Sequence, residues 1–185
     1  MELLDIVDKD NKLTGKTKER KLVHEEELWH RQTGCFIMNK KGELLFQKRS
    51  SNKDDNPNKW GKTGGHIEAG EEPISAIQRE IFEEIGIKVE EAELELLSID
   101  KNVYYSRKNK KFHKYYGYTY FTVLDLELCK CKIQKEELTN LRYISIEEME
   151  RIRKENNENY TFTNWKNFDE IIEYLKEKRE LIKIK

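Results

Sequence analysis

The chain has little of what stabilises secreted mini-proteins and nothing resembling a membrane span. Its three cysteines, Cys35, Cys129 and Cys131, are an odd number in 185 residues, which argues against a disulfide framework. No run approaches the ~18 apolar residues of a membrane-spanning helix. The first residues lack the basic start and apolar run of a signal peptide. These absences predict a reduced, cytoplasmic protein that does not enter a membrane.

The chain also has almost no net charge. Lysine and arginine number 35 and aspartate and glutamate 36, giving a formal charge of −1. No global basic field would draw such a chain to nucleic acid, so we expect neither nucleic acid nor membrane as a partner. The length fits one domain, residues 1–185, with residues 1–30 as an N-terminal hairpin extension and residues 163–185 as a C-terminal helix. The oligomeric state is open, with a homodimer as one option.

Apolar periodicity and turn residues predict an α/β protein with a mixed β-sheet and helices on both of its faces. The expected strands are Leu3–Asp8, Leu13–Thr17, Thr33–Met38, Glu43–Lys48, Leu94–Tyr105, His113–Leu124, Leu128–Ile133 and Leu141–Ile144. Cys129 and Cys131 would pack on one face of their strand. After the central helix, described next, we expect a helix over Ile146–Lys154, capped by Ser145, and a last helix from Asn164 to about Ile182.

One stretch, from Gly65 to Ile87, concentrates the candidate chemistry. A glycine loop leads into a helix that Pro73 can open and Gly86 can end. At roughly 100° per residue, the isoleucines at positions 74, 77, 81 and 85 share one arc that can face a core. The glutamates at positions 80, 83 and 84 share a neighbouring arc, because residues three and four apart are neighbours on a helix.

Clustered carboxylates repel one another and need a counter-charge. Mg²⁺ prefers oxygen ligands and commonly binds one or two carboxylates together with substrate phosphates. The alternative is a solvated acidic face, which is expected in a chain of which 38% is charged. The acidic helix alone does not decide between these interpretations.

The order of residues around the helix resembles the Nudix box. That motif runs Gly, five residues, Glu, seven residues, Arg-Glu, an aliphatic, any residue, Glu-Glu, any residue, Gly, an aliphatic. Its specified positions are filled by Gly65, Glu71, Arg79, Glu80, Ile81, Glu83, Glu84, Gly86 and Ile87. The resemblance implies an α/β/α sandwich and a hydrolase that uses Mg²⁺ or Mn²⁺. The implied substrate is a small molecule, a nucleoside diphosphate linked to another group X.

The resemblance also implies roles for single residues. It assigns metal binding to the backbone carbonyl of Gly65. It also assigns metal binding to the carboxylates of Glu80, Glu83 and Glu84. A pair between Glu71 and Arg79 would hold the glycine loop against the helix without touching substrate. These two residues are therefore expected to support the site structurally.

The general base and the phosphate contacts stay open at this stage. Glu83 or Glu84 could serve as catalytic base, and Glu137, just before the strand Leu141–Ile144, is a third candidate. An exposed glutamate in a charged turn is an equal interpretation of Glu137. Lys48 and Arg49 end a core strand and could bind phosphate oxygens, although solvated strand-end charges fit equally well.

Other segments resemble the isopentenyl-diphosphate isomerase branch of the same family, namely Leu28–Arg31, Leu45–Ser50, Pro57–Trp60 and Gly64–His66. The isomerase uses a cysteine, two positions before a histidine, to protonate or deprotonate the allylic carbon of its substrate. Here the histidine would be His66 and the cysteine position is Gly64, so isomerisation has no evident acid. The isomerase also binds metal through several histidines. His30 and His66 stand in comparable places and His24 is offset, so we expect ordinary histidines. The alternatives to a hydrolase are an isomerase-like enzyme and a non-catalytic nucleotide-binding domain.

Overall fold

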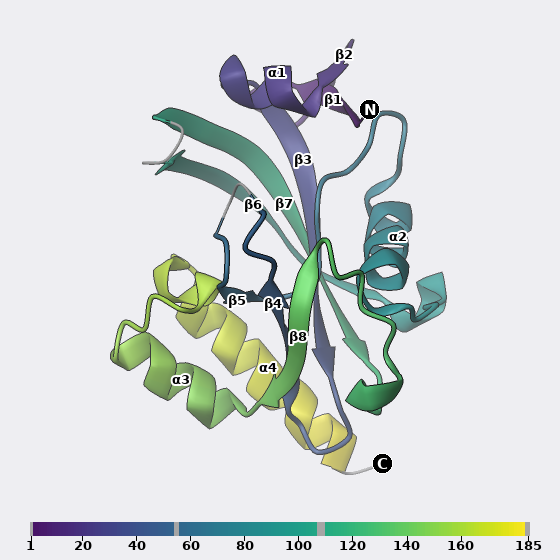
Figure 1. Ribbon diagram of the computed structural model, residues 1–185, viewed down its shortest axis with the longest axis vertical. Helices are drawn as coiled ribbons and strands as arrows, with labels where there is room; N and C mark the ends of the chain where they lie inside the picture. Colours follow the sequence, from purple (N-terminus) through teal and green to yellow (C-terminus); the bar gives the residue numbers. More distant parts are fainter. Residues whose placement is uncertain (1, 54–55, 107–109, 184–185) are drawn as a thin grey trace. The chain divides into compact units, whose positions relative to one another are not determined.

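The computed structural model describes residues 2–53, 56–106 and 110–183, and Figure 1 labels its elements. The strands are β1 (Leu3–Val7), β2 (Leu13–Glu19), β3 (Trp29–Met38), β4 (Leu44–Arg49), β5 (Trp60–Gly61), β6 (Glu95–Ser106), β7 (Lys111–Val123) and β8 (Leu138–Ile144). The helices are α1 (Arg20–Glu25), α2 (Pro73–Ile85), α3 (Ile146–Lys154) and α4 (Phe168–Lys183). The expected turn between β6 and β7 lies partly outside the described residues.

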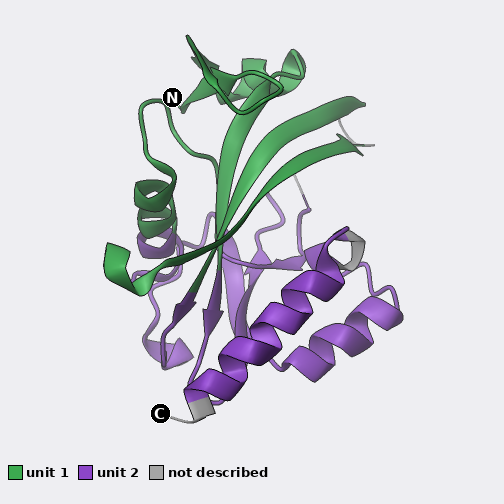
Figure 2. Ribbon diagram, turned by 180° about the vertical axis from the view of Figure 1, so that it is seen from behind, with its two compact units in different colours: residues 1–35, 64–80, 89–121 green, residues 36–63, 81–88, 122–185 purple. Residues whose placement is uncertain are grey.

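The chain divides into two compact units, which Figure 2 colours separately. The first comprises Met1–Cys35, Gly64–Glu80 and Val89–Phe121, and the second Phe36–Thr63, Ile81–Lys88 and Thr122–Lys185. Strands β3 and β7 and helix α2 contribute residues to both units. Each unit is therefore assembled from three segments that are distant in sequence. The expectation of a single domain over 1–185 stays a prediction.

The first unit opens with the expected hairpin. Strands β1 and β2 pair antiparallel, and Asn11 adopts a positive φ of 64° in the turn between them, a conformation that asparagine tolerates better than most residues. A small core of Leu4, Ile6 and Val23 joins the hairpin to α1. Because α1 offers only one fully buried side chain, its position depends on this hairpin.

Two long strands dominate the rest of the first unit. Strands β6 and β7 pair antiparallel from Glu95↔Phe121 to Ser106↔Lys111, with a bulge between Leu96 and Ser98. The strand order here is β3-β7-β6. Both strands were expected from their aromatic and β-branched residues, and their bounds shift by one or two residues.

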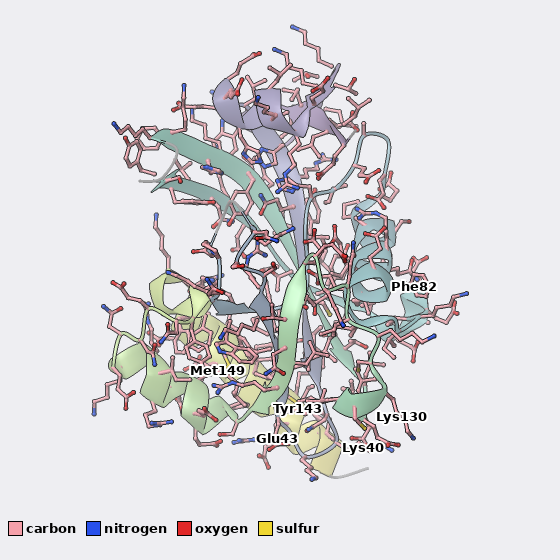
Figure 3. All side chains as sticks on the ribbon, in the orientation of Figure 1. Lys40, Glu43, Phe82, Lys130, Tyr143 and Met149 are labelled. Carbon is pink, nitrogen blue, oxygen red and sulfur yellow. The ribbon has the colours of Figure 1, made fainter. Side chains whose placement is uncertain are left out.

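The second unit is built on β4. This strand pairs with β3 at Met38↔Leu44, with β5 at Lys48↔Trp60 and with β8 along its length. Helix α3 begins as expected, because the Ser145 side chain accepts a hydrogen bond from the Glu148 backbone N–H at 3.0 Å. Met149 of α3, labelled in Figure 3, is fully buried.

These elements confirm the expected fold class. The chain is an α/β protein with a mixed β-sheet and an antiparallel N-terminal hairpin. None of the helices within the described residues is long and apolar enough to cross a membrane.

Two expected elements are wrong. Leu128–Ile133 is not a strand: Leu128–Lys130 forms a 3₁₀ turn with local hydrogen bonds, Cys129 is exposed and Cys131 is half-buried. The last helix begins at Phe168, not Asn164, because Thr161–Asn164 forms a separate 3₁₀ turn that ends in the extended backbone of Trp165. The Trp165 ring packs on Phe36, with ring centroids 5.7 Å apart. The chain is extended at Trp165, so the helix starts after this contact.

Candidate active site

Helix α2 carries the residues on which the candidate site depends. It starts at Pro73 and ends at Ile85, and Gly86 follows with a φ of +74°, the left-handed conformation that commonly ends helices. Ile77, Ile81 and Ile85 are fully buried. The apolar arc therefore anchors the helix, and its geometry leaves Glu80, Glu83 and Glu84 on neighbouring helical positions.

Within the first unit, Arg79 lies at the centre of a hydrogen-bonded network. Its Nε and Nη2 donate to the two carboxylate oxygens of Glu71, each at 2.9 Å. Nη2 also donates to the backbone oxygen of His66 at 3.0 Å, and Nη1 to Oε1 of Glu80 at 2.9 Å. The hydrogen bonds to Glu71 raise the pKa of Arg79 above its ordinary value. The expected pair is thus present, and it is tied to the glycine loop and to a candidate ligand.

Gly65 lies against the Glu80 carboxylate. A Cβ atom at position 65 would overlap the Glu80 carboxylate, so any other residue here would require the Glu80 side chain to move away. The Gly65 carbonyl accepts a hydrogen bond from the Thr33 backbone N–H at 2.9 Å. A carbonyl oxygen has two lone pairs, which leaves this one able to bind a second group.

Within the second unit, the two adjacent glutamates have different surroundings. Glu83 is exposed, as is the preceding residue Phe82, which Figure 3 labels and which is 49% exposed. Glu84 is only 4% exposed, and its Oε1 accepts a hydrogen bond from Gln47 Nε2 at 2.8 Å. An exposed carboxylate can reach solvent and substrate, whereas a buried one is held in place.

Glu137 lies in the turn that leads into β8. Its carboxylate forms an ion pair with Lys53, and its backbone oxygen accepts from the Ser50 backbone N–H at 2.8 Å. The same loop is attached to the end of α2, because the Gln134 N–H donates to the backbone oxygen of Glu84 at 3.3 Å. Glu137 is therefore a paired side chain of the second unit, and not an isolated surface charge.

Lys48 and Arg49, the two expected phosphate contacts, are the last two residues of β4. Side chains alternate between the two faces of a regular strand, but the pairing of β4 with β8 shifts register between Lys48 and Arg49, so alternation does not place the Arg49 side chain. Lys48 shares a face with its cross-strand neighbour Trp60. The roles of Lys48 and Arg49 as phosphate contacts stay predictions.

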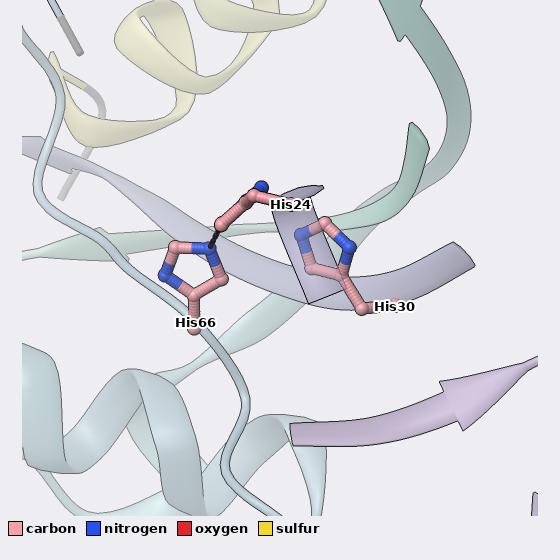
Figure 4. Close-up of side chains that lie close together, drawn as sticks. All are labelled: His24, His30 and His66. Atoms are coloured by element: carbon pink, nitrogen blue, oxygen red, sulfur yellow. Dashed lines mark hydrogen bonds between the residues drawn. The ribbon is translucent and has the colours of Figure 1, made fainter. Parts of the chain in front are cut away.

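All four histidines of the chain gather in the first unit; the isomerase resemblance draws attention to His24, His30 and His66 but not to His113. His24 of α1 lies near the other three, with ring centroids 5.0 Å from His30, 5.2 Å from His66 and 4.8 Å from His113. Figure 4 shows three of them, with the 3.1 Å contact between Nε2 of His24 and Nε2 of His66 dashed.

The histidine cluster has the chemistry of a metal site. One ring nitrogen from each of His24, His30 and His66 lies within 4.8 Å of the others. Burial lowers the pKa of His30 to about 4, so this ring is neutral near pH 7 and keeps a lone pair for a ligand. Neutral imidazoles suit transition-metal ions more than Mg²⁺. The fold brings the histidines of α1, β3, β7 and the glycine loop together, and whether they are ordinary histidines or metal ligands stays a prediction.

Comparison with known proteins decides the family. A model of the NUDIX domain matches residues 28–166. The chain belongs to the Nudix hydrolase family. This Nudix hydrolase is 34% identical over 154 residues to an uncharacterized Nudix hydrolase of Clostridium acetobutylicum, which covers 81% of this chain and 73% of the relative. It is 34% identical over 90 residues to an isopentenyl-diphosphate Delta-isomerase of Serratia proteamaculans, across 48% of this chain and 50% of that one.

A solved structure supports the fold of the Nudix hydrolase. A crystal structure of a Deinococcus radiodurans protein superposes with a TM-score of 0.61 at 20% identity, covering 82% of this chain and 88% of that protein. Nudix hydrolases use divalent metal ions and act on small-molecule diphosphates. The residue roles, the identity of the metal and the homodimer stay predictions for this chain.

Proposed function

We propose that this Nudix hydrolase uses Mg²⁺, or Mn²⁺ in its place, to add water across the diphosphate linkage of a nucleoside diphosphate joined to another group X. The products are two phosphate esters. The observation that carries the proposal is the group of glutamates on α2. Ile77, Ile81 and Ile85 of this helix are buried, and Arg79 binds the backbone of the glycine loop that precedes it. The complete motif favours catalysis over a nucleotide-binding domain without activity.

The residues present fit a hard divalent ion. Carboxylate oxygens are the preferred ligands of Mg²⁺, and Glu80, Glu83 and Glu84 offer them from a single helix. The close approach of Glu80 to Gly65, which a Cβ atom would block, brings a carboxylate beside a backbone segment that carries a carbonyl. These three glutamates, with the Gly65 carbonyl, would hold the metal ion.

A bound divalent ion would neutralise phosphate charge and lower the pKa of a bound water. The remaining roles belong to the chain. Glu83, as the exposed carboxylate, could reach both metal and water, and Glu137 is held near the end of β4 by Lys53 as an alternative base. Arg49, the last residue of β4, could bind a phosphate oxygen through its planar guanidinium.

The test is a panel of nucleoside diphosphate derivatives, incubated with metal-free protein and with the same protein plus Mg²⁺ or Mn²⁺. We expect metal-dependent release of two phosphate esters from at least one compound, detected by chromatography. If no diphosphate is cleaved with either metal, the proposed activity is wrong.

A second candidate is an isomerase-like activity, because the histidine cluster and the partial isomerase relative favour it. Gly64 argues against it, because glycine has no thiol to act as the acid that the isomerase resemblance requires. A Cβ atom there would lie 2.2 Å from the Thr33 backbone oxygen and 2.6 Å from the Gly34 Cα, so a cysteine cannot replace Gly64 unless the backbone moves. We therefore expect no interconversion of isopentenyl and dimethylallyl diphosphate; metal-dependent isomerisation by the purified protein would reverse this ranking.

A further inference from the structure

A buried amide interrupts the apolar strand β4. Gln47 follows Leu45 and Phe46, and its side chain is only 1% exposed. Burying an amide costs free energy unless its polar atoms find partners, and leucine would fill a similar volume without that cost. The position therefore calls for an explanation based on what the amide contacts.

Both ends of the Gln47 amide are used. Its Nε2 donates to Glu84 Oε1 at 2.8 Å, and its Oε1 accepts from the Thr63 hydroxyl at 3.2 Å. The NH₂ group of Gln47 therefore faces Glu84 and its amide oxygen faces Thr63, which gives a continuous chain of hydrogen bonds from the Thr63 hydroxyl to the Glu84 carboxyl group.

The three side chains are held away from solvent. Thr63 is 1% exposed and lies just after β5, while Glu84 is 4% exposed on the last turn of α2. A hydrogen bond to a buried carboxylate is stronger than one in water, because the surrounding dielectric is low. The contact therefore restrains the rotation of the Glu84 carboxylate.

We propose that Gln47 and Thr63 are positioning residues that orient Glu84 as a ligand of the catalytic divalent ion. The inference rests on the proposed function, since it takes Glu84 as a metal ligand. Groups that hydrogen-bond metal-ligating carboxylates fix their orientation, and losing such a group costs about 10–100-fold in metal affinity or activity. Neither residue touches substrate in this account.

The experiment measures Mn²⁺ affinity by titration of the full-length protein without substrate. We expect Gln47→Leu and Thr63→Val each to weaken Mn²⁺ binding by about 10-fold or more. Thr63→Ser keeps the hydroxyl and should recover most of the affinity that Thr63→Val loses. Glu84→Gln should weaken binding as well, and adding Gln47→Leu to it should have no further effect, because Gln47 acts through Glu84.

The matched control is Thr122→Val. Thr122 is 2% exposed on β7, and its hydroxyl has no hydrogen-bond partner among the described residues. This variant should bind Mn²⁺ like the unmodified protein, and circular dichroism would establish that all variants are folded.

The outcomes separate the two proposals. If Gln47→Leu is folded and binds Mn²⁺ as tightly as the unmodified protein, or if its effect adds fully to that of Glu84→Gln, the positioning role is wrong even when the protein hydrolyses diphosphates. If Mn²⁺ binding weakens as expected but no diphosphate is cleaved, the positioning role stands and the proposed activity fails.

Discussion

Neighbouring residues of one motif can have different physical tasks. Glu83 and Glu84 are about 100° apart on α2, and this rotation exposes one carboxylate and buries the other beside Gln47. The spacing of the motif predicts that both glutamates share a helix face with Glu80. It does not predict the partner of Glu84, because Gln47 comes from a strand distant in sequence.

Arg79→Ala should lower both stability and metal affinity. The substitution removes two hydrogen bonds to Glu71, one to the His66 backbone and one to Glu80. Breaking a partly buried ion pair strands its partner, for which we expect a loss of about 2 kcal/mol and several degrees of melting temperature. Thermal melts and Mn²⁺ titrations check this.

Glu71→Gln is the companion of that variant. It should lower the melting temperature and weaken Mn²⁺ binding in the same direction, and the double variant should be no worse than the sum of the two. If Arg79→Ala raises only the KM for substrate, with melting and metal affinity unchanged, Arg79 contacts phosphate directly and the structural role is wrong.

Glu137→Gln separates the candidate bases. If Glu137 accepts the proton of the attacking water, the variant should lose about 100-fold in kcat with little change in KM. Lys53→Met removes its ion-pair partner but keeps the carboxylate, so the loss should be smaller. A rate near that of the unmodified protein for Glu137→Gln would place the base at Glu83 or Glu84.

At the scale of elements, local signals predicted those elements that are stabilised locally. Helix α3 has its Ser145 cap and α2 has Pro73 at its start and Gly86 after its end, so their bounds follow from the sequence. The start of α4 did not follow, because Trp165 leaves the helical path to pack on Phe36. A tertiary contact, which local helix propensity does not report, therefore accompanies the later start of α4.

Ser145→Ala tests the local part of this account. The serine side chain accepts the Glu148 backbone N–H at the start of α3. Loss of such a cap costs about 1 kcal/mol, or roughly 2–4 °C in a protein of this size. Ser145→Asp keeps an acceptor and should melt near the unmodified protein; equal melting of the alanine variant would show that the cap adds nothing.

At the scale of the whole molecule, the spacing of the histidines does not show that they cluster, although the isomerase resemblance points to three of them. Positions 24, 30, 66 and 113 have no common period, and only the strand pairing and the path of the glycine loop bring them together. The Nudix box, by contrast, is continuous in sequence, so the candidate site on α2 was visible before the fold. Long-range sites of this kind need the tertiary structure.

Burial of His30 gives the metal-free protein a predictable pH dependence. Its pKa is lowered from 6.5 to about 4, chiefly by desolvation. Between these values the unfolded chain binds the extra proton, so stability is complete above pH 6.5 and is lost as pH falls towards about 4. The loss from this group is at most about 3 kcal/mol.

Melting temperatures of metal-free protein across that pH range test the assignment. His30→Gln has no titrating ring at this position, so its melting temperature should fall less steeply between pH 6.5 and 4. If the two proteins lose stability with the same slope, His30 is not the group responsible.

The central claim is that the carboxylates of α2 bind the metal ion that hydrolysis requires. Its most direct measurement is the rate of diphosphate cleavage by Glu83→Gln at saturating Mg²⁺, beside the unmodified protein. Glu83 is exposed and should not be needed for folding, so we expect an unchanged melting temperature and a rate lower by about 100-fold or more, because a metal ion contributes several kcal/mol to transition-state stabilisation. A folded variant that cleaves the substrate at nearly the unmodified rate would contradict the metal site proposed for this Nudix hydrolase.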